Sequence, residues 1–417
     1  MIKRLVNVFL LIMPAVTYSF DWGASVSSGL KYTSNAFLDE SASVSEIQRD
    51  VSLSTNVKHQ SKASSIGGNY QVNRNYYPDS FATDTTVQGR SDVSVAILPG
   101  NLTWMASHLR VDTLRDFNSN DTPANRAIRE NFQTGPVLSL RLTPTDTFHS
   151  GYTRSWTSTE FDPDRDNETD TASISYNRAL NALTNVSLSM SQSEISFDRA
   201  LGYESSSQSI SLDRKIKDGN ISILVGNNEV DQFLTKTKSP LITIDMAKSL
   251  LDASFSLGYS KMLTHTSLDI SDLGQDVSNF GLIDVAEVIE RETFRGGFSK
   301  EISDGLSASL NAYTDTSTSQ TTSLSFDRKG VTARGEYLRP LSQSSTATTS
   351  YVLNYLESGQ SGLLDESTIH SFSVSYKNSI TQDLSLDATA NYSTRSGSRD
   401  SDFDHSSISI RMLYVFR

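Results

Sequence analysis

Apolar and polar residues alternate singly along most of this chain, and this alternation is its strongest pattern. In the stretch 384–392, leucine, alanine and tyrosine occupy every second position, and serine, aspartate, threonine and asparagine stand between them. The same alternation occurs at 22–32, 51–57, 66–76, 138–142, 186–190, 210–212, 372–376 and 408–416. Successive side chains of a strand point to opposite faces, so the pattern predicts an all-β chain whose strands have one apolar and one polar face.

Short polar turns and longer polar connections divide these strands. The short turns lie at 59–64, 98–101, 143–146, 180–183, 216–219, 249–251, 301–305, 340–344 and 379–383. The longer connections lie at 33–46, 114–128, 160–170, 197–205, 264–290, 356–366 and 396–404. Each interval between short turns can hold one hairpin. The chain therefore predicts a single transmembrane antiparallel β-barrel of about 20 strands, with short periplasmic turns and longer extracellular loops.

The strand count depends on residues 318–338, where the alternation changes phase near Lys329 and Gly330. We interpret this segment as one long bulged strand, because a bulge inserts one residue and exchanges the two faces. A barrel of 18 strands is the alternative. A soluble repeated sandwich is disfavoured, because the hairpin interval is steady and no linker interrupts it.

The two ends of the chain carry export and assembly features. Lys3 and Arg4 precede an apolar run at 8–13, and small residues follow, which predicts a signal peptide over 1–19 and a barrel over 20–417. The apolar run is shorter than the roughly 20 residues of a transmembrane helix. The last strand ends in Tyr414 and Phe416, which we interpret as a C-terminal signal for the barrel-assembly machinery.

Composition agrees with a hollow barrel. Only 36% of the residues are hydrophobic, which suits a fold whose lumen is wet and whose outer face alone meets lipid. The absence of cysteine excludes disulfides and thiolate metal sites. The net charge of −12 and the lack of a basic patch argue against nucleic acid as a partner. Outer-membrane lipid and lipopolysaccharide are the predicted surroundings.

Several segments together resemble a known group of barrels. They are YTSNAFL at 32–38, DVSLS at 50–54, GNYQVNRNYY at 68–77, GPVLSLRLTPTD at 135–146 and YTRS at 152–155. In this arrangement the chain resembles the porin-like outer-membrane β-barrels found at exopolysaccharide and exosortase (PEP-CTERM) loci of Gram-negative bacteria. The resemblance implies an outer-membrane pore associated with polysaccharide production or export, with export components as partners.

Signatures of catalysis are sparse. The sequence has no GxSxG, P-loop or Gly-rich dinucleotide turn, so we predict neither an enzyme nor a cofactor. A weak hydrolase candidate is His405, which stands between Asp404 and Ser406.

One acidic loop is a weak metal candidate. The alternating carboxylates of Asp162, Asp164 and Asp166 offer hard oxygens to a divalent cation that could bridge to lipopolysaccharide. The alternative interpretation is a solvated loop.

The polar phase of the strands is the predicted functional surface. The residues assigned to the lumen are Lys58, Asn69, Gln71, Asn73, Arg141, Asp213, Lys215, Asp327, Lys377, Asp387 and Arg411. Their mixed charges and amides suit polar solutes or sugars, so we predict a porin-like channel for polysaccharide or small polar solutes. A closed structural or adhesive surface barrel is the alternative. The segment 282–291 has a helix-like spacing and could constrict the lumen or cap the rim.

Overall fold

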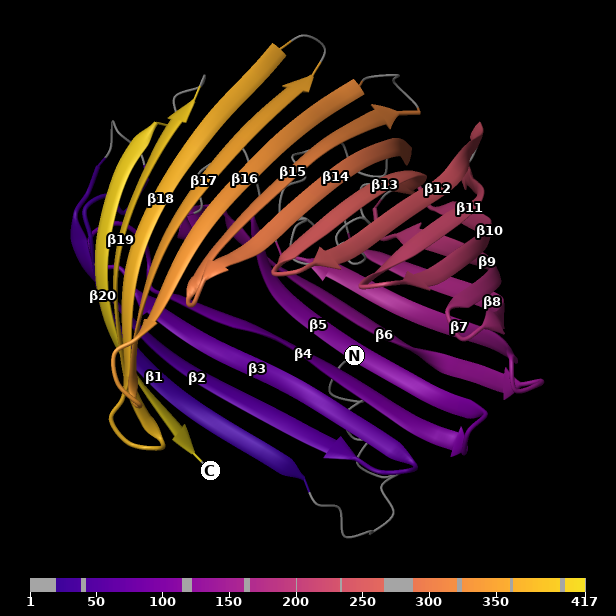
Figure 1. The fold of residues 1–417 in the computed structure, drawn as a ribbon, viewed down its shortest axis with the longest axis horizontal. Coiled ribbons are helices and arrows are strands. Elements are labelled where there is room, and N and C mark those ends of the chain that lie inside the picture. Colours follow the sequence, from indigo (N-terminus) through magenta and orange to yellow (C-terminus); the bar gives the residue numbers. More distant parts are fainter. Residues whose placement is uncertain are drawn as a thin grey trace.

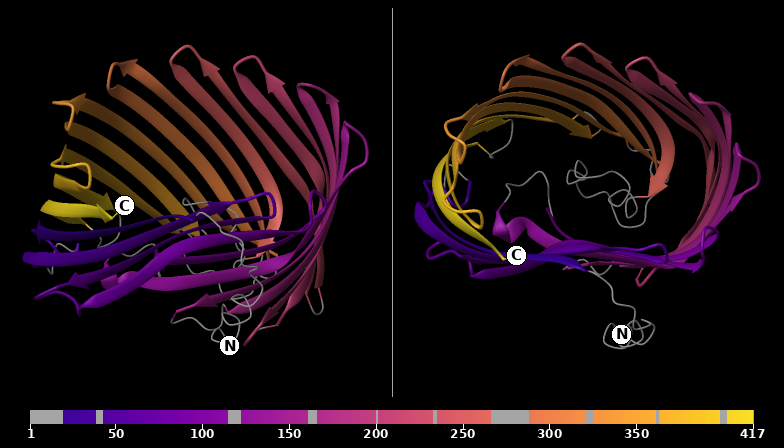
Figure 2. Two further views of the ribbon diagram at one scale, coloured as in Figure 1. Left: turned by 90° about the horizontal axis from the view of Figure 1, so that it is seen from below. Right: turned by 60° about the horizontal axis from the view of Figure 1, so that its bottom comes forward.

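The computed structural model describes residues 20–38, 43–114, 122–160, 166–199, 201–232, 235–265, 288–320, 325–360, 363–397 and 402–416. These residues form one antiparallel sheet of 20 strands in which each strand pairs with the next along the chain (Figure 1). The first strand also pairs with the last, so the sheet closes on itself. Figure 2 shows the sheet curving round until β20, in yellow, meets β1, in indigo.

The strands have similar lengths, from 13 to 17 residues. They are β1 (Asp21–Thr33), β2 (Glu46–Gln60), β3 (Ser64–Tyr76), β4 (Asp84–Leu98), β5 (Leu102–Leu114), β6 (Arg126–Arg141), β7 (Asp146–Thr159), β8 (Asn167–Asn181), β9 (Thr184–Phe197), β10 (Tyr203–Ile216), β11 (Gly219–Gln232), β12 (Thr235–Leu250), β13 (Ala253–His265), β14 (Val288–Ser303), β15 (Leu306–Ser319), β16 (Ser325–Pro340), β17 (Ser345–Gln360), β18 (Leu363–Ser379), β19 (Leu384–Gly397) and β20 (Phe403–Phe416). A 3-10 turn, η1 (Pro123–Asn125), precedes β6. The predicted all-β barrel of 20 strands is confirmed.

The bulge predicted within 318–338 is wrong. β15 ends at Ser319 and β16 begins at Ser325, and β16 pairs with both neighbours without a shift of register. The change of phase has another cause. At the start of β16, the outer face carries the charged residues Asp327 and Lys329, and it becomes apolar only at Val331. These charged residues belong to the outer face, but in the sequence they have the polar character expected of residues that face the lumen.

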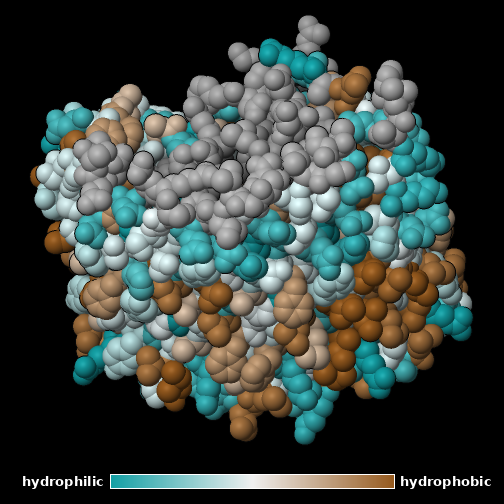
Figure 3. Space-filling model, turned by 90° about the horizontal axis from the view of Figure 1, so that it is seen from above, coloured by the Kyte–Doolittle hydropathy of each residue, from teal (hydrophilic) through white to brown (hydrophobic). Residues whose placement is uncertain are grey.

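The outer face of the barrel is apolar over much of its height. Large hydrophobic side chains on it are exposed although they belong to regular strands, and examples are Leu30, Leu53, Ile210, Phe294 and Ile410. Figure 3 shows such hydrophobic residues gathered in the lower part of one face, with a largely hydrophilic zone above them. No helix among the described residues is long and apolar enough to cross a membrane. A closed barrel with an apolar outer belt satisfies every backbone group inside lipid.

The closing strand contributes to an aromatic border at the end of the barrel that carries the short turns. Phe416 pairs with Ala24 of β1, two residues from Trp22, and the rings of Tyr414 and Phe416 meet edge to face at 4.9 Å. The strand thus has the predicted phase, and its role as an assembly signal stays a prediction. Residues 1–19, the predicted signal peptide, lie outside the described residues.

A tyrosine ring lies against a glycine on the lumen side of the seam between β15 and β16. Tyr313 pairs with Gly330, and a Cβ atom at position 330 would stand 2.3 Å from the ring. We expect G330A to lower the free energy of unfolding by about 1–3 kcal/mol, because the ring must leave its position. Urea titration in detergent, followed by tryptophan fluorescence, measures this.

The control for that substitution lies on the same strand. A Cβ atom at Gly335 would meet nothing within 4 Å. G335A should therefore leave stability unchanged or raise it by about 0.4–1 kcal/mol, since alanine restricts the unfolded chain. Equal losses in the two variants would show that the ring contact contributes nothing.

Candidate functional site

The lumen face of the barrel follows from register, because residues paired directly across the sheet share a face. Ten of the eleven residues predicted to line the lumen lie on the face opposite the exposed hydrophobic side chains: Lys58, Asn69, Gln71, Asn73, Arg141, Asp213, Lys215, Lys377, Asp387 and Arg411. Asp327 does not. It shares the face of Val331 and Tyr337 and accepts a hydrogen bond from Thr316 Oγ1, so its assignment to the lumen is corrected.

Three of the predicted residues form one row across the sheet. Asp387 pairs with Lys377 on one side and with Arg411 on the other. The row continues through β1 to Asp50, whose carboxylate lies 3.2 Å from the Arg411 guanidinium. Opposite charges therefore neighbour one another along this wall.

An amide-rich cavity of about 510 Å³ adjoins that row on β1 to β4 and β20. Gln71 Nε2 donates to Asn73 Oδ1 at 2.6 Å and to Ser52 Oγ at 3.0 Å. Lys31 and Asp50 also line this cavity, and no pattern in the sequence singled out either of them. Amides and paired charges supply donors and acceptors together, which is what a polyhydroxylated solute requires.

A wall of hydroxyl groups covers the lumen face of β8, β9 and β10. Ser187, Ser189 and Ser191 each face a serine of β10, namely Ser211, Ser209 and Ser207, at 2.5, 2.8 and 2.8 Å between hydroxyl oxygens. Thr171 of β8 extends the wall to Ser193 at 2.9 Å. The signal for this wall was present in the sequence, since serines occupy every second position of 187–193 and 205–211.

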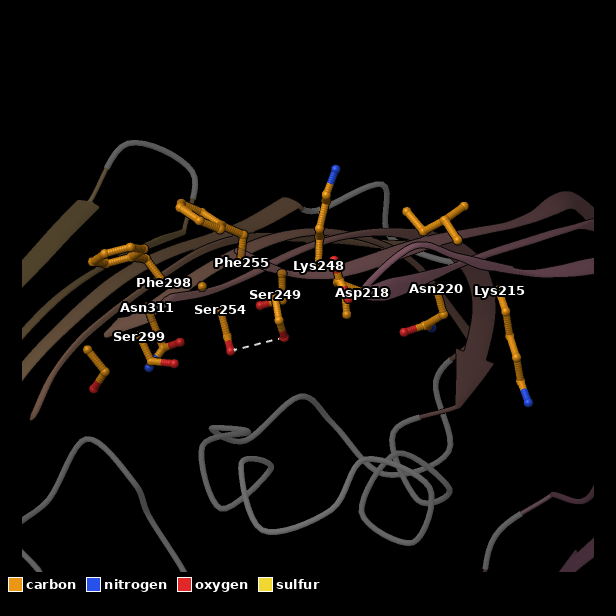
Figure 4. A pocket seen from close by; sticks show the side chains of 16 residues that line it. Lys215, Asp218, Asn220, Lys248, Ser249, Ser254, Phe255, Phe298, Ser299 and Asn311 are labelled. Atoms are coloured by element: carbon orange, nitrogen blue, oxygen red, sulfur yellow. Dashed lines mark hydrogen bonds between the residues drawn. The ribbon is translucent and has the colours of Figure 1, made fainter. Parts of the chain in front are cut away.

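A second hollow, of about 810 Å³, lies on β10 to β15 at the end of the barrel that carries the short turns. Figure 4 shows Lys215, Asn220, Ser254, Ser299 and Asn311 on one side of the sheet, and Phe255, Phe298 and Lys248 on the other. The rings of Phe255 and Phe298 lie 5.0 Å apart. Alternation thus produces a polar lumen surface and an apolar outer surface within the same few strands.

The remaining predicted lumen residues are apart from one another. Asp213 accepts a hydrogen bond from Ser222 Oγ at 2.6 Å. Arg141 stands at the end of β6 and donates to the carbonyl oxygen of Pro144 at 3.1 Å. Lys58 pairs with Asp21 in register at the same end of the barrel.

A buried ion cluster on the lumen face was not predicted. Asp315 is 3% exposed and accepts from Arg291 at 2.7 and 3.2 Å, from Arg328 at 3.3 Å and from Thr293 Oγ1 at 3.0 Å. Its three charged members come from β14, β15 and β16. The sequence carries no motif for such a cluster, because only strand pairing places these residues side by side.

The hydrolase candidate does not form a catalytic arrangement. His405 Nδ1 lies 3.2 Å from Thr33 Oγ1 and 3.2 Å from the carbonyl oxygen of Asn35, on the lumen side. Ser406 pairs with Tyr392 and therefore lies on the outer face, and Asp404 accepts from the Tyr392 hydroxyl at 3.3 Å. Adjacent strand residues point apart, so this histidine has neither neighbour as a partner.

The metal and helix candidates fall mostly outside the described residues. Asp162, Asp164 and residues 282–287 are not among them. Asp166 Oδ1 accepts a hydrogen bond from the Thr159 backbone at 2.7 Å. The described part of the chain contains no group of three or more carboxylate or histidine side chains arranged to hold a metal ion. Residues 288–291 belong to β14, so the helix-like spacing there does not mark a helix.

Comparison with known proteins identifies the architecture. No protein-family model and no curated protein sequence matches the chain. The FrpB iron transporter of Neisseria meningitidis is similar in structure, with a TM-score of 0.51 and 10% identity over 95% of this chain and 82% of that one. The siderophore receptor PirA of Pseudomonas aeruginosa is similar with a TM-score of 0.51 and 10% identity, over 97% of this chain and 81% of that one. The ferric enterobactin receptor PfeA of the same organism is similar with a TM-score of 0.52 and 9% identity, over 94% of this chain and 80% of that one.

These likenesses are at low identity and show the fold. The chain has the architecture of bacterial outer-membrane β-barrels, and its apolar outer belt is the surface that such a membrane requires. The protein is accordingly a barrel of the bacterial outer membrane.

Proposed function

We propose that the barrel is a porin-like channel for polar, sugar-like solutes. The observation that carries the proposal is the hydroxyl wall of β8 to β10, which shares the lumen of one closed barrel with the amide cavity of β1 to β4. Hydroxyl and amide groups can replace the hydration shell of a sugar without attracting one sign of ion.

The charges of the lumen support a solute of low net charge. Arg411 is paired with Asp50, Arg90 with Asp92 and Arg295 with Asp245 on the lumen face. Paired charges contribute dipoles and hydrogen bonds but little net potential along the path. A channel selective for one ion sign would need an excess of unpaired charge on its walls.

Planar-bilayer recording with the purified barrel tests the proposal. We expect conductance steps that are interrupted by neutral oligosaccharides, and severalfold shorter blocks in S207L/S209L, since leucine removes hydroxyls from the wall. The matched control is Q208L, which lies between these serines on the outer face and should leave the blocks unchanged. Absence of conductance at any voltage would instead support a closed structural or adhesive barrel.

The finer proposal, export of a polysaccharide, rests on the resemblance of segments 32–38, 68–77 and 135–146 to barrels of exopolysaccharide loci. A polymer chain would meet donors and acceptors along the whole wall. The test is secretion of the polysaccharide by a deletion strain complemented with wild-type or S207L/S209L protein. Full secretion without the barrel would refute export while leaving the channel proposal intact.

A further inference from the structure

Cationic side chains on the outer face, in the half of the barrel that carries the longer loops, are generally paired with carboxylates. Examples on five different strands are Arg110 with Glu130 at 2.8 Å, Arg154 with Glu168, Lys238 with Glu229 at 2.7 Å, Lys261 with Glu290 at 2.9 Å and Lys329 with Glu357 at 2.8 Å. The wall made by β2 and β3 differs. Arg49 and Arg74 lie there, both exposed, and neither has a carboxylate within ion-pair distance among the described residues.

Register places these two arginines beside each other. Arg49 pairs with Tyr76, and Arg74 pairs with Val51, so the arginines are diagonal neighbours on one face. Diagonal Cα atoms in a sheet are about 7–8 Å apart, which is within reach of two long side chains directed at one group. The guanidinium of Arg74 stands 5.3 Å from the centre of the Tyr76 ring.

The acidic residues beside these arginines on β2 and β4, Asp50 and Asp84, face the lumen. Asp50 follows Arg49 and alternates to the inner face, where it pairs with Arg411. Asp84, at the start of β4, lines the amide cavity. On the outer face the cross-strand neighbours of the arginines are Leu30, Tyr76, Val51 and Thr85. Among the described residues, the two positive charges therefore have no carboxylate partner, and their surroundings on the sheet are largely apolar and aromatic.

Their height on the barrel corresponds to a membrane border. Trp22 and Tyr32 of β1 are 10 residues apart on the outer face. At about 3.3 Å per residue and a tilt near 40°, this separation spans about 25 Å along the barrel axis, the height of an outer-membrane belt. Tyr32 and Tyr76 mark the border on the side of the longer loops, and both arginines lie within a few residues of it.

We infer that Arg49 and Arg74 form a binding site for the phosphate group of a glycolipid in the outer leaflet. A guanidinium presents parallel N–H donors that match phosphate oxygens, and two of them neutralise a phosphate dianion. Tyr32 and Tyr76 lie at the level of the sugar rings. The acyl chains would pack on Leu30, Val51 and Val72. At the other outer-face cations in this half of the barrel, the paired carboxylates would repel an anionic headgroup.

Binding of bis-phosphorylated lipid A to the purified barrel, followed by native mass spectrometry, tests the site. We expect R49Q and R74Q each to weaken binding about tenfold, since one charge-assisted contact of roughly 1.4 kcal/mol corresponds to that factor. Lipid A without phosphates should bind about as weakly to wild type as the phosphorylated form binds to the R49Q/R74Q double variant. The control is K329Q, an outer-face cation already paired with Glu357, which should bind as wild type does.

Three results would overturn the inference. They are equal binding of phosphorylated and dephosphorylated lipid A, an equal loss in K329Q, and displacement of the lipid by inorganic phosphate at comparable concentrations. The last would identify a free-phosphate site instead of a headgroup site. Heat-modifiable gel mobility shows that each variant is folded, so a loss of binding cannot come from misfolding.

Discussion

Substitution of Asp315 by alanine is expected to lower the free energy of unfolding by about 3–5 kcal/mol, because it removes the buried carboxylate that Arg291 and Arg328 share. Arg328 is 5% exposed and Asp315 is 3% exposed, so water replaces the lost carboxylate poorly. Thr293 loses its acceptor as well. The cluster joins β14, β15 and β16, and its loss should weaken the pairing of three consecutive strands.

The matched control for that prediction is D327A on the adjacent strand. Asp327 lies on the outer face, with Thr316 as its hydrogen-bond donor, and exposed interactions of this kind contribute about 0–1 kcal/mol. Urea unfolding in lipid vesicles compares the two variants. If D315A lost no more stability than D327A, the buried cluster would not hold these strands together.

A charge placed on the outer belt of β10 should cost far more than the same charge one residue away. Ile210 is on the outer face and is half exposed, near the middle of its strand, whereas Ser209 faces the lumen and bonds to Ser189. We expect I210R to lose about 2–4 kcal/mol, the cost of arginine near the centre of a bilayer. S209R should lose about 1 kcal/mol, since its side chain extends into a wet lumen.

Folding into vesicles, scored by heat-modifiable mobility and by urea midpoint, measures both variants. A larger loss for S209R than for I210R would contradict the assignment of faces on which the lumen, the hydroxyl wall and the lipid site all depend. The comparison of I210R with S209R therefore tests the assignment of faces for the whole barrel and not for β10 alone.

Alternation along individual strands was sufficient to predict the architecture. The nine short turns and the single phase of 408–416 predicted 20 strands and a closing β20, and the structure has both. The assignment of residues to the lumen failed at Asp327, because this residue lies on the outer face beyond the apolar belt, where that face is charged. A rule that equates polar residues with the lumen holds only at the height of the lipid.

The candidate site was predicted in part. Gln71, Asn73, Asp387 and Arg411 lie on the face opposite the exposed hydrophobic side chains, and Asp387 and Arg411 are cross-strand partners. The partner of Arg411, Asp50, was missed because it stands more than 350 positions away in the sequence. Closure of β1 against β20 brings the two together, and no local pattern encodes that contact.

By itself, the sequence determined the strand content, the hairpin repeat and which face of most strands meets lipid, because a period of two and turn residues are local properties of the chain. Only the tertiary structure decided which charges are neutralised. Asp315 lies between two arginines, Arg411 meets Asp50 across the closure, and Arg49 and Arg74 have no carboxylate partner in the described part of the chain. Charge pairing depends on distances between strands, and those distances exist only once the sheet has closed.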